Sequence, residues 1–435
     1  MLEYILKMAK RVAESAEVFL ITSEETPVEF EANNLKHIQR KQSQIVALRI
    51  INKGRIGYSV TNNLDDIDNL IDASLATAEF GMPARFDFPT TLSHPEVKIY
   101  DKETASVSLE HMVRLGERMI TTVKKHNKDI ICEASILKNL ISVKIINSNG
   151  KSAGYSKSVF SLGIEGNLIR GTDMLFVAEN LNSCHPLDST RNITDTIIRQ
   201  LEWADEQATV SSKILPIIFT PSGVASALMN PLMVAFNGKT VLEGASPIGN
   251  LLGEQVFDSK LNLYDDATID YRPSSHPFDD EGVEGQRIPL IEAGTPINFI
   301  YDLQTAALAG KDSTGNGKRH GGGLPSPSPN AFVVSSGDVP FNDMLADLKN
   351  GLVIEYLMGA EQGNILGGDF SGNILLGYKV ENGKIKGRVK DTMVSGNVYQ
   401  LLKEIAAIGN DSKWVDSIIN TPSLYCPGIS VSVKN

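Results

Sequence analysis

The stretch "GNILLGYKVENGKIKGRV" (residues 372–389) sets the first expectation for the fold. It holds two runs rich in apolar residues, and the dipeptide Asn382-Gly383 separates them. Asn-Gly is a preferred sequence for a two-residue β-hairpin turn, because both residues tolerate a positive φ. The stretch therefore predicts antiparallel strands in the C-terminal part of the chain.

A helical period follows this hairpin in "SGNVYQLLKEIAAIGND" (residues 395–411). Its apolar residues recur at the spacing of one helix face. Ser395 or Asn397 can cap the start of such a helix, and Gly409 suits its end. We expect a late helix over residues 395–409. Helices packed on largely antiparallel strands indicate an α+β fold.

The first half of the chain alternates between stretches with helical spacing of apolar residues and stretches typical of strands. Residues 1–85 read as helix, several strands and helix, and residues 98–210 read as helix, strands and helix. From residue 211 onward Gly and Pro become dense between short strands. We expect an N-terminal α+β domain over residues 1–210, with 1–85 and 98–210 as two candidate units. A strand-rich C-terminal domain over residues 211–435 should follow.

Composition excludes several classes of function. The chain has 435 residues and a formal net charge of -11, and it lacks the basic face on which nucleic-acid binding depends. No apolar run approaches the roughly 18 residues that span a bilayer. Three scattered cysteines argue against a disulfide framework and fit a reducing compartment. We expect a cytoplasmic protein without direct contact to nucleic acid or membrane.

The glycine-rich stretch "TGNGKRHGGGLPSPSPN" (residues 314–330) is the first candidate site. It is not a phosphate-binding P-loop, because Arg319 stands where Ser or Thr would bind magnesium and no helix can follow. One interpretation is a flexible surface loop. The other is a ligand-facing loop whose glycines permit close approach of a backbone. The candidate substrate-binding residues are Thr314, Gly315, Asn316, Gly317, Lys318, Arg319 and His320.

Metal-binding and nucleophile patterns are weak. No two of the seven histidines have the spacing of an HExxH-like pair. The best remaining cluster is His276 with Asp279, Asp280 and Glu281, for which a polar turn is the alternative. No GxSxG is present, and Ser222 suits a helix cap better than a nucleophile. The sequence assigns no catalytic residue.

Several stretches together resemble the TldD/PmbA family, which carries the old label of modulators of DNA gyrase and is regarded as a metallopeptidase family. The most specific are "STGNGKR" (residues 313–319) and "GDFSGNILLGYKVENGKI" (residues 368–385), supported by "FTPSGVASAL" (residues 219–228). The resemblance runs from near residue 50 to the C-terminus. It implies a protein concerned with proteolysis.

The family has two kinds of chain, and the resemblance distinguishes them. TldD-type chains carry HExxxH on a helix, with two zinc-binding histidines and a glutamate base. The corresponding stretch here is "MNPLMV" (residues 229–234), and Cys426 does not match the zinc cysteine of the family. The chain resembles the PmbA kind, also called TldE. This implies no metal in the chain itself and zinc on a TldD-like partner.

The resemblance also implies partners and substrates. A PmbA-type chain pairs with a TldD-type chain in a heterodimer that degrades unfolded polypeptides or trims leader peptides. The glycine-rich loop would then line a cleft for an extended peptide. One alternative is a homodimeric peptide-binding or chaperone-like module without catalytic activity. Another is an independent hydrolase that uses His276 and the acids of residues 279–281 with a different metal.

Overall fold

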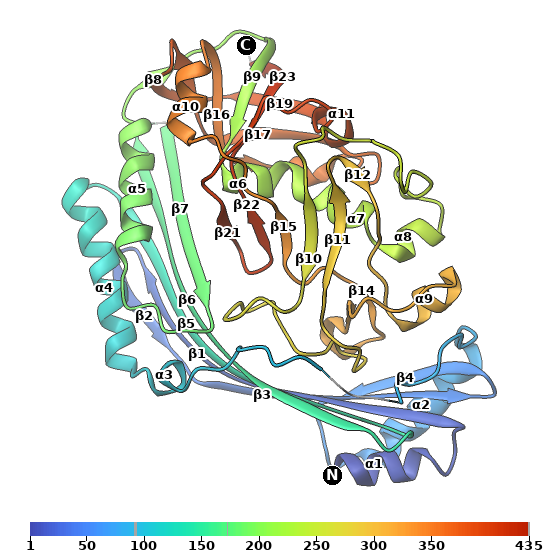
Figure 1. Ribbon diagram of the computed structural model, residues 1–435. Helices are drawn as coiled ribbons and strands as arrows, with labels where there is room; N and C mark the ends of the chain where they lie inside the picture. Colours follow the sequence, from blue (N-terminus) through green and yellow to red (C-terminus); the bar gives the residue numbers. More distant parts are fainter. Residues whose placement is uncertain (91–93, 172, 434–435) are drawn as a thin grey trace.

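The computed structural model describes residues 1–90, 94–171 and 173–433, and it consists of a long curved sheet with a compact lobe seated against it (Figure 1). The sheet has the order β4-β3-β1-β5-β6-β7, and β2 pairs with β1 beside this path. Its strands are β1 (Ser15–Glu31), β2 (Asn34–Ile38), β3 (Lys41–Asn52), β4 (Arg55–Thr61), β5 (Ile131–Asn147), β6 (Ser152–Arg170) and β7 (Asp173–Ser183).

Strand β1 joins the two candidate units of the N-terminal half. It pairs antiparallel with β5 from Glu17 opposite Asn147 to Phe30 opposite Ala134, so residues 1–85 and 98–210 contribute to one sheet. The β3–β4 hairpin turns at Lys53 and Gly54, which both have a positive φ.

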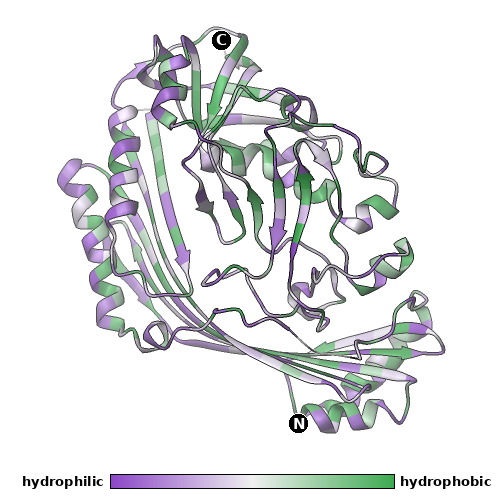
Figure 2. Ribbon diagram, viewed as in Figure 1, coloured by the Kyte–Doolittle hydropathy of each residue, from purple (hydrophilic) through white to green (hydrophobic). Residues whose placement is uncertain are grey.

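Helices cover this sheet near its two ends (Figure 1). Helices α1 and α2 pack their apolar faces on β1 and β3, whereas α4 packs Met112, Leu115 and Met119 with Val28 and Ile136. Hydrophobic and hydrophilic residues alternate along α4 and α5 (Figure 2), as expected for helices with one buried face. The helices of this half are α1 (Leu2–Ala9), α2 (Ile67–Phe80), α3 (Lys102–Ser106), α4 (Leu109–His126) and α5 (Arg191–Trp203).

The C-terminal lobe contains an eight-stranded and a six-stranded sheet. The larger has the order β16-β9-β23-β19-β17-β18-β8, and a further pairing of β16 with β17 closes the circuit β16-β9-β23-β19-β17. The smaller has the order β12-β11-β10-β15-β22-β21. The strands of the larger sheet are β8 (Gln207–Ala208), β9 (Lys213–Phe219), β16 (Asn350–Met358), β17 (Asp369–Glu381), β18 (Lys384–Val389), β19 (Thr392–Asn397), β20 (Ala407–Ile408) and β23 (Leu424–Val433).

Short helices and strands fill the rest of the lobe. The six-stranded sheet is made of β10 (Leu263–Asp266), β11 (Arg287–Glu292), β12 (Thr295–Pro296), β15 (Phe332–Val334), β21 (Lys413–Val415) and β22 (Ile419–Thr421). A separate pair consists of β13 (Gly317–Lys318) and β14 (Ser326–Pro327). The helices are α6 (Pro221–Val224), the π-helical η1 (Ala225–Met229), α7 (Asn230–Ala235), α8 (Gly238–Leu242), α9 (Leu303–Ala309), η2 (His320–Gly322), α10 (Phe341–Asp347), η3 (Ala360–Gln362) and α11 (Val398–Leu401).

The architecture confirms the α+β class and the hairpin at Asn382-Gly383, where both residues have a positive φ between β17 and β18. The late helix over residues 395–409 is wrong in extent, because α11 covers only Val398–Leu401 after the cap Asn397. Residues 392–397 pair with β17 and β23, and Ile405 donates its backbone N–H to Asp258. Val398 and Leu401 are buried from this short helix, whereas Ile408 is buried from strand β20, which pairs with β23. No helix in the described part is long and apolar enough to cross a membrane.

Candidate functional site

The glycine-rich loop lies between α9 and β14 and packs against the segment of residues 279–285. A Cβ on Gly317 would meet the Glu281 carboxylate at 2.5 Å, and Gly315 has a φ of +70. Glycine is therefore required at both positions for close packing. Thr314 and Lys318 are half-buried, and His320 is exposed. The buried members of the predicted set are Gly315, Asn316, Gly317 and Arg319.

Two of the predicted acids hold this loop by its backbone. Asp279 Oδ2 accepts a hydrogen bond from the Gly317 N–H at 2.8 Å, and Asp280 Oδ2 accepts one from the Arg319 N–H at 2.7 Å. The other oxygen of Asp279 accepts from the N–H groups of Glu281 and Val283. Burial raises the pKa of both aspartates. The loop and the acids, which the sequence separates, form one unit in the fold.

The third acid, Glu281, joins this unit to the N-terminal sheet. Arg49 of β3 donates to Glu281 Oε1 at 2.5 Å and lies 3.0 Å from Glu17 of β1. Arg319 reaches the same Glu17 oxygen at 2.5 Å. Phe86 stacks against the Arg49 guanidinium at 4.8 Å. Arg319 is thus engaged in an interdomain ion cluster, which is a structural role.

His276 is buried in a hydrogen-bonded network. Its Nε2 lies 2.7 Å from Asn330 Oδ1, and Asn330 and Asn316 both donate to Asp265. Burial lowers the pKa of His276 to about 3, so the ring is uncharged near neutral pH. Lys318 donates to the Pro329 carbonyl. Across residues 1–90, 94–171 and 173–433, no three His, Cys, Asp or Glu side chains are arranged to hold a metal ion.

The side chains of residues 229–234, the segment that the resemblance matches to the zinc motif, do not fit zinc. Thr220 caps α6 by accepting from the Gly223 N–H, so the predicted cap at Ser222 is wrong by two residues. The helix then widens into the π turn η1 and continues as α7, where Pro231 occupies the first turn. Residues 229–234 offer a thioether, an amide and apolar groups, and Met229 is buried in the core. No imidazole or carboxylate is available there.

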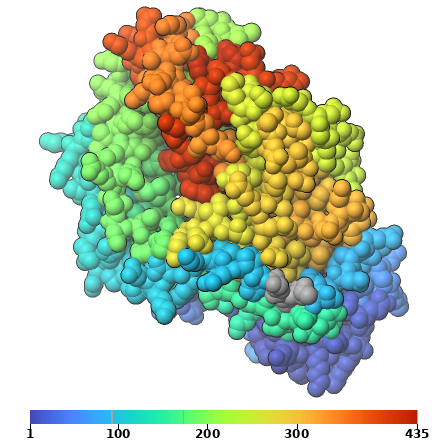
Figure 3. Space-filling model, viewed as in Figure 1, coloured from blue at the N-terminus to red at the C-terminus, as the bar shows by residue number. Residues whose placement is uncertain are grey.

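Two adjoining cavities lie beside the start of this helix, where the N-terminal sheet meets the C-terminal lobe. Their volumes are about 410 Å³ and about 200 Å³, and Glu179, Ser222 and Lys413 line both. We name them together the interdomain cleft. Figure 3 shows the segments that form it meeting on one face, with β7 and α5 in green, α10 in orange and the β21–β22 region in red.

Charged side chains line the cleft from both halves of the chain. Lys413 of β21 pairs with Glu179 of β7. Glu355 of β16 accepts from Gln200 Nε2 at 2.7 Å and lies 3.1 Å from the Arg199 guanidinium of α5. Burial raises the pKa of Glu355, and the charge of Arg199 opposes this. Such a mixture of buried and rim charges is typical of a binding site.

Two strand edges flank the cleft. Strand β7 ends the order of the seven-stranded sheet, and β21 ends the order of the six-stranded sheet. The Asn182 amide bridges the gap by donating to the Asp416 carbonyl at 3.2 Å. Gln200 covers the β7 edge at Ala178, because its amide bonds both the N–H and the carbonyl of that residue. Within the described residues, β21 pairs with a single strand, β22.

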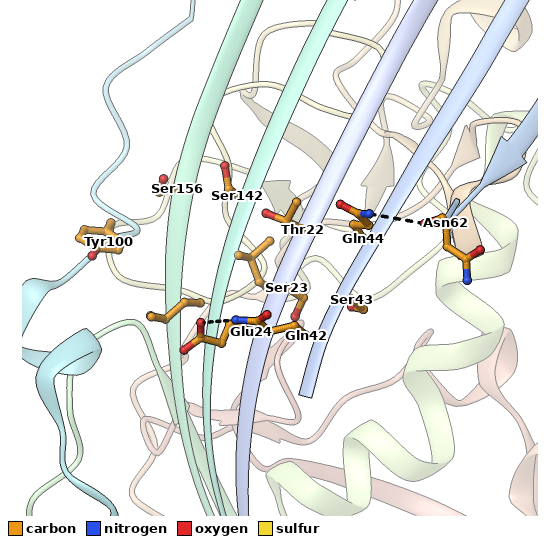
Figure 4. Close-up of a pocket in the computed structure, with 12 residues that line it drawn as sticks. Thr22, Ser23, Glu24, Gln42, Ser43, Gln44, Asn62, Tyr100, Ser142 and Ser156 are labelled. Carbon is orange, nitrogen blue, oxygen red and sulfur yellow. Dashed lines mark hydrogen bonds between the residues drawn. The ribbon is translucent and has the colours of Figure 1, made fainter. Parts of the chain in front are cut away.

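A larger hollow of about 800 Å³ lies on the middle of the N-terminal sheet (Figure 4). A polar row crosses four neighbouring strands there, with Gln44, Thr22, Ser142 and Ser156 opposite one another in register. Its carboxylate, Glu24, is paired with Arg40 and Gln42. Hydroxyl and amide groups alone do not indicate a catalytic site or a site for a charged ligand. The interdomain cleft is therefore the stronger candidate.

The cleft residues were not predicted from the sequence. Glu179, Arg199, Glu355 and Lys413 belong to different elements and share no motif. One signal was present: Glu355 is a carboxylate inside the apolar strand "NGLVIEYLM". A charge at such a position needs a partner or a function.

Comparison with known proteins gives matches over most of the chain. Residues 211–433 match the model of the PmbA/TldA metallopeptidase C-terminal domain, and residues 16–78 match that of PmbA/TldA metallopeptidase domain 1. An uncharacterized protein of Methanocaldococcus jannaschii is 26% identical over 98% of this chain and 99% of its own length. Metalloprotease PmbA of Escherichia coli O157:H7 is 24% identical over 98% and 94%.

A solved structure shares the fold. The crystal structure of TldE from Thermococcus kodakarensis superimposes with a TM-score of 0.89 and covers 99% of both chains, at 20% sequence identity. Both the curved sheet and the lobe therefore have counterparts in a known structure.

Proposed function

Because the chain belongs to the PmbA/TldD metallopeptidase family, we propose that it is the PmbA-type subunit of a zinc metallopeptidase complex. A TldD-type chain supplies the zinc in this assembly, and the present chain binds the polypeptide substrate. Unfolded polypeptides and leader peptides are the substrates that we propose.

One observation carries this proposal. The resemblance implies that residues 229–234 stand where TldD-type chains carry HExxxH, and this helical segment contains neither His nor Glu. Imidazole and carboxylate groups are needed to bind zinc and to accept a proton from water. A metallopeptidase fold without these groups fits a subunit whose catalytic partner is another chain.

The interdomain cleft supports a role in substrate binding. Strand β21 lines it and ends the order of its sheet, and an extended peptide can add to an edge strand through main-chain hydrogen bonds. This mode of binding reads little side-chain information, which suits unfolded substrates. The loop of residues 314–320 is less suitable for this role, because the functional groups of Lys318 and Arg319 have partners within the protein.

Digestion of fluorescent casein tests the proposal. The chain alone, an HExxxH-bearing homologue from the same genome alone, and their mixture are compared at equal concentration. Activity that requires the mixture supports the subunit role. Full activity of the homologue without this chain contradicts it, as does digestion by this chain alone. A stable homodimer that binds casein and never activates the homologue would favour the chaperone-like module.

A further inference from the structure

The larger cavity of the interdomain cleft has an excess of negative charge. Three carboxylates line it, those of Glu179, Glu355 and Asp411, against two cationic side chains, those of Arg199 and Lys413. Each cation already has a carboxylate partner in Glu355 or Glu179. The cavity therefore keeps one formal negative charge.

Asp411 carries this excess charge at the rim. Its carboxylate accepts from the backbone N–H of Ser423 at 2.9 Å and from the Ser423 hydroxyl at 2.6 Å. Within the described residues no cationic side chain pairs with it. A ligand cation would complete its interactions.

Glu355 forms the floor of the cavity, and one of its oxygens is incompletely bonded. The side chain is 3% exposed. Its Oε1 faces the Arg199 guanidinium at 3.1 Å but accepts no well-aligned hydrogen bond, whereas Oε2 accepts from Gln200. The buried Tyr378 hydroxyl lies beside the same carboxylate, without a hydrogen bond of good geometry. A carboxylate oxygen can accept two hydrogen bonds, so Glu355 Oε1 can accept one from a ligand as well.

Apolar side chains form one wall of the same cavity. Leu181 of β7 and Phe341 of α10 are half-buried, and Pro221 at the start of α6 is buried. Such a wall suits the aliphatic stem of a long side chain whose charged head reaches the floor. A volume of about 410 Å³ is enough for one such side chain.

We propose that this cavity is a specificity pocket that takes one lysine or arginine side chain of an extended polypeptide. The ammonium or guanidinium group reaches Glu355 Oε1, with the half-buried Asp411 and the buried Glu179 also lining the cavity, and the stem lies against Leu181 and Phe341. The inference rests on the proposed function, because the peptide backbone is placed along β21. Main-chain hydrogen bonds to β21 would not select among side chains. The pocket adds a preference for basic residues.

Binding of short peptides to the full chain tests the pocket. A labelled Gly/Ala/Ser peptide carries one central residue: Lys, Arg, norleucine or Glu. Fluorescence anisotropy should give an affinity for the Lys and Arg peptides about tenfold tighter than for the norleucine peptide, as a charge-assisted hydrogen bond provides. Equal affinity for Lys and norleucine, or no binding of any peptide, overturns the inference.

Substitutions identify the residue responsible. Glu355→Gln should abolish the preference for Lys and leave the affinity for norleucine unchanged. Glu202→Gln, on the exposed side of α5 outside the cavity, is the matched control and should retain the preference. Because Glu355→Gln leaves Arg199 without its partner, thermal unfolding is recorded for each variant. If Glu355→Gln does not fold, the same peptides are measured with Asp411→Asn. An undiminished preference for Lys over norleucine in that variant contradicts the proposed pocket.

The outcome separates this inference from the proposed function. A chain that activates its partner on casein but shows no preference for basic peptides contradicts only the pocket. A chain that prefers Lys but never activates the partner contradicts only the subunit role.

Discussion

Arg319 and Glu17 form a buried ion pair although 302 positions separate them in the sequence. The distance between Arg319 Nη2 and Glu17 Oε1 is 2.5 Å, and the two side chains are 1% and 0% exposed. Burial raises the pKa of Glu17, while the charges of Arg49 and Arg319 oppose this. The glycine-rich loop is thus anchored to the first strand of the N-terminal sheet.

Removal of this anchor should destabilise the protein strongly. Arg319→Met leaves a buried carboxylate with one cation fewer, and breaking such a pair costs about 3–5 kcal/mol. Urea unfolding measures the change. Arg191→Met is the control, because its pair with Asp195 is exposed and should contribute less than about 1 kcal/mol. Equal losses for the two variants would contradict the structural role of the cluster.

Gly317 should not tolerate a side chain. Its Cβ would meet three atoms of the buried Glu281 side chain between 2.5 and 2.9 Å, and that side chain is held by Arg49 and by the Leu303 N–H. We expect Gly317→Ala to cost about 1–3 kcal/mol in the free energy of unfolding. Gly323→Ala in the same loop has room, since its nearest neighbour is at 3.4 Å. A change under about 0.5 kcal/mol for both variants would refute this packing.

His276 should make stability depend on pH in a defined direction. Burial lowers its pKa to about 3 in the folded protein, whereas the unfolded chain has a value near 6.5. Between these two pKa values the unfolded state binds more protons than the folded state. The stability that the neutral His276 ring contributes is therefore complete above about pH 6.5 and is lost as the pH falls. The stability of wild type relative to His276→Gln should fall by about 2 kcal/mol from pH 7.5 to 5.

Chemical denaturation at several pH values measures this difference between wild type and variant. Subtraction cancels the titration of the neighbouring aspartates. His37→Gln, at an exposed position, serves as the control. A difference for His276→Gln that stays constant from pH 7.5 to 5 would show that the ring is accessible to protons in the folded state.

Local rules account for much of the fold. Helix α4 begins after Ser108 because the Ser108 side chain accepts a hydrogen bond from the His111 N–H and an apolar face follows. The turn at Asn382-Gly383 has the backbone conformation that its residue types favour. The helix over residues 395–409 failed because sheet pairing of residues 392–397 and 407–408 decides that stretch, and no local pattern encodes such pairing.

The candidate sites also include features that the sequence predicted and features that only the fold shows. The sequence singled out the loop of residues 314–320 and the acids of residues 279–281 separately, and only the fold shows that they bind each other. The interdomain cleft was missed, because Glu179, Glu355 and Lys413 come from three strands that are distant in sequence. Glu355 within an apolar strand was the one local signal that a buried charge required an explanation.

The zinc content of the purified chain tests the central claim most directly. The chain alone, and its complex with an HExxxH-bearing homologue, are dialysed against zinc-free buffer and analysed by mass spectrometry of the metal. We predict negligible zinc in the isolated chain and one zinc ion per homologue chain in the complex. Stoichiometric zinc in the isolated chain would contradict the account, because residues 229–234 and the described remainder of the chain offer no site for it.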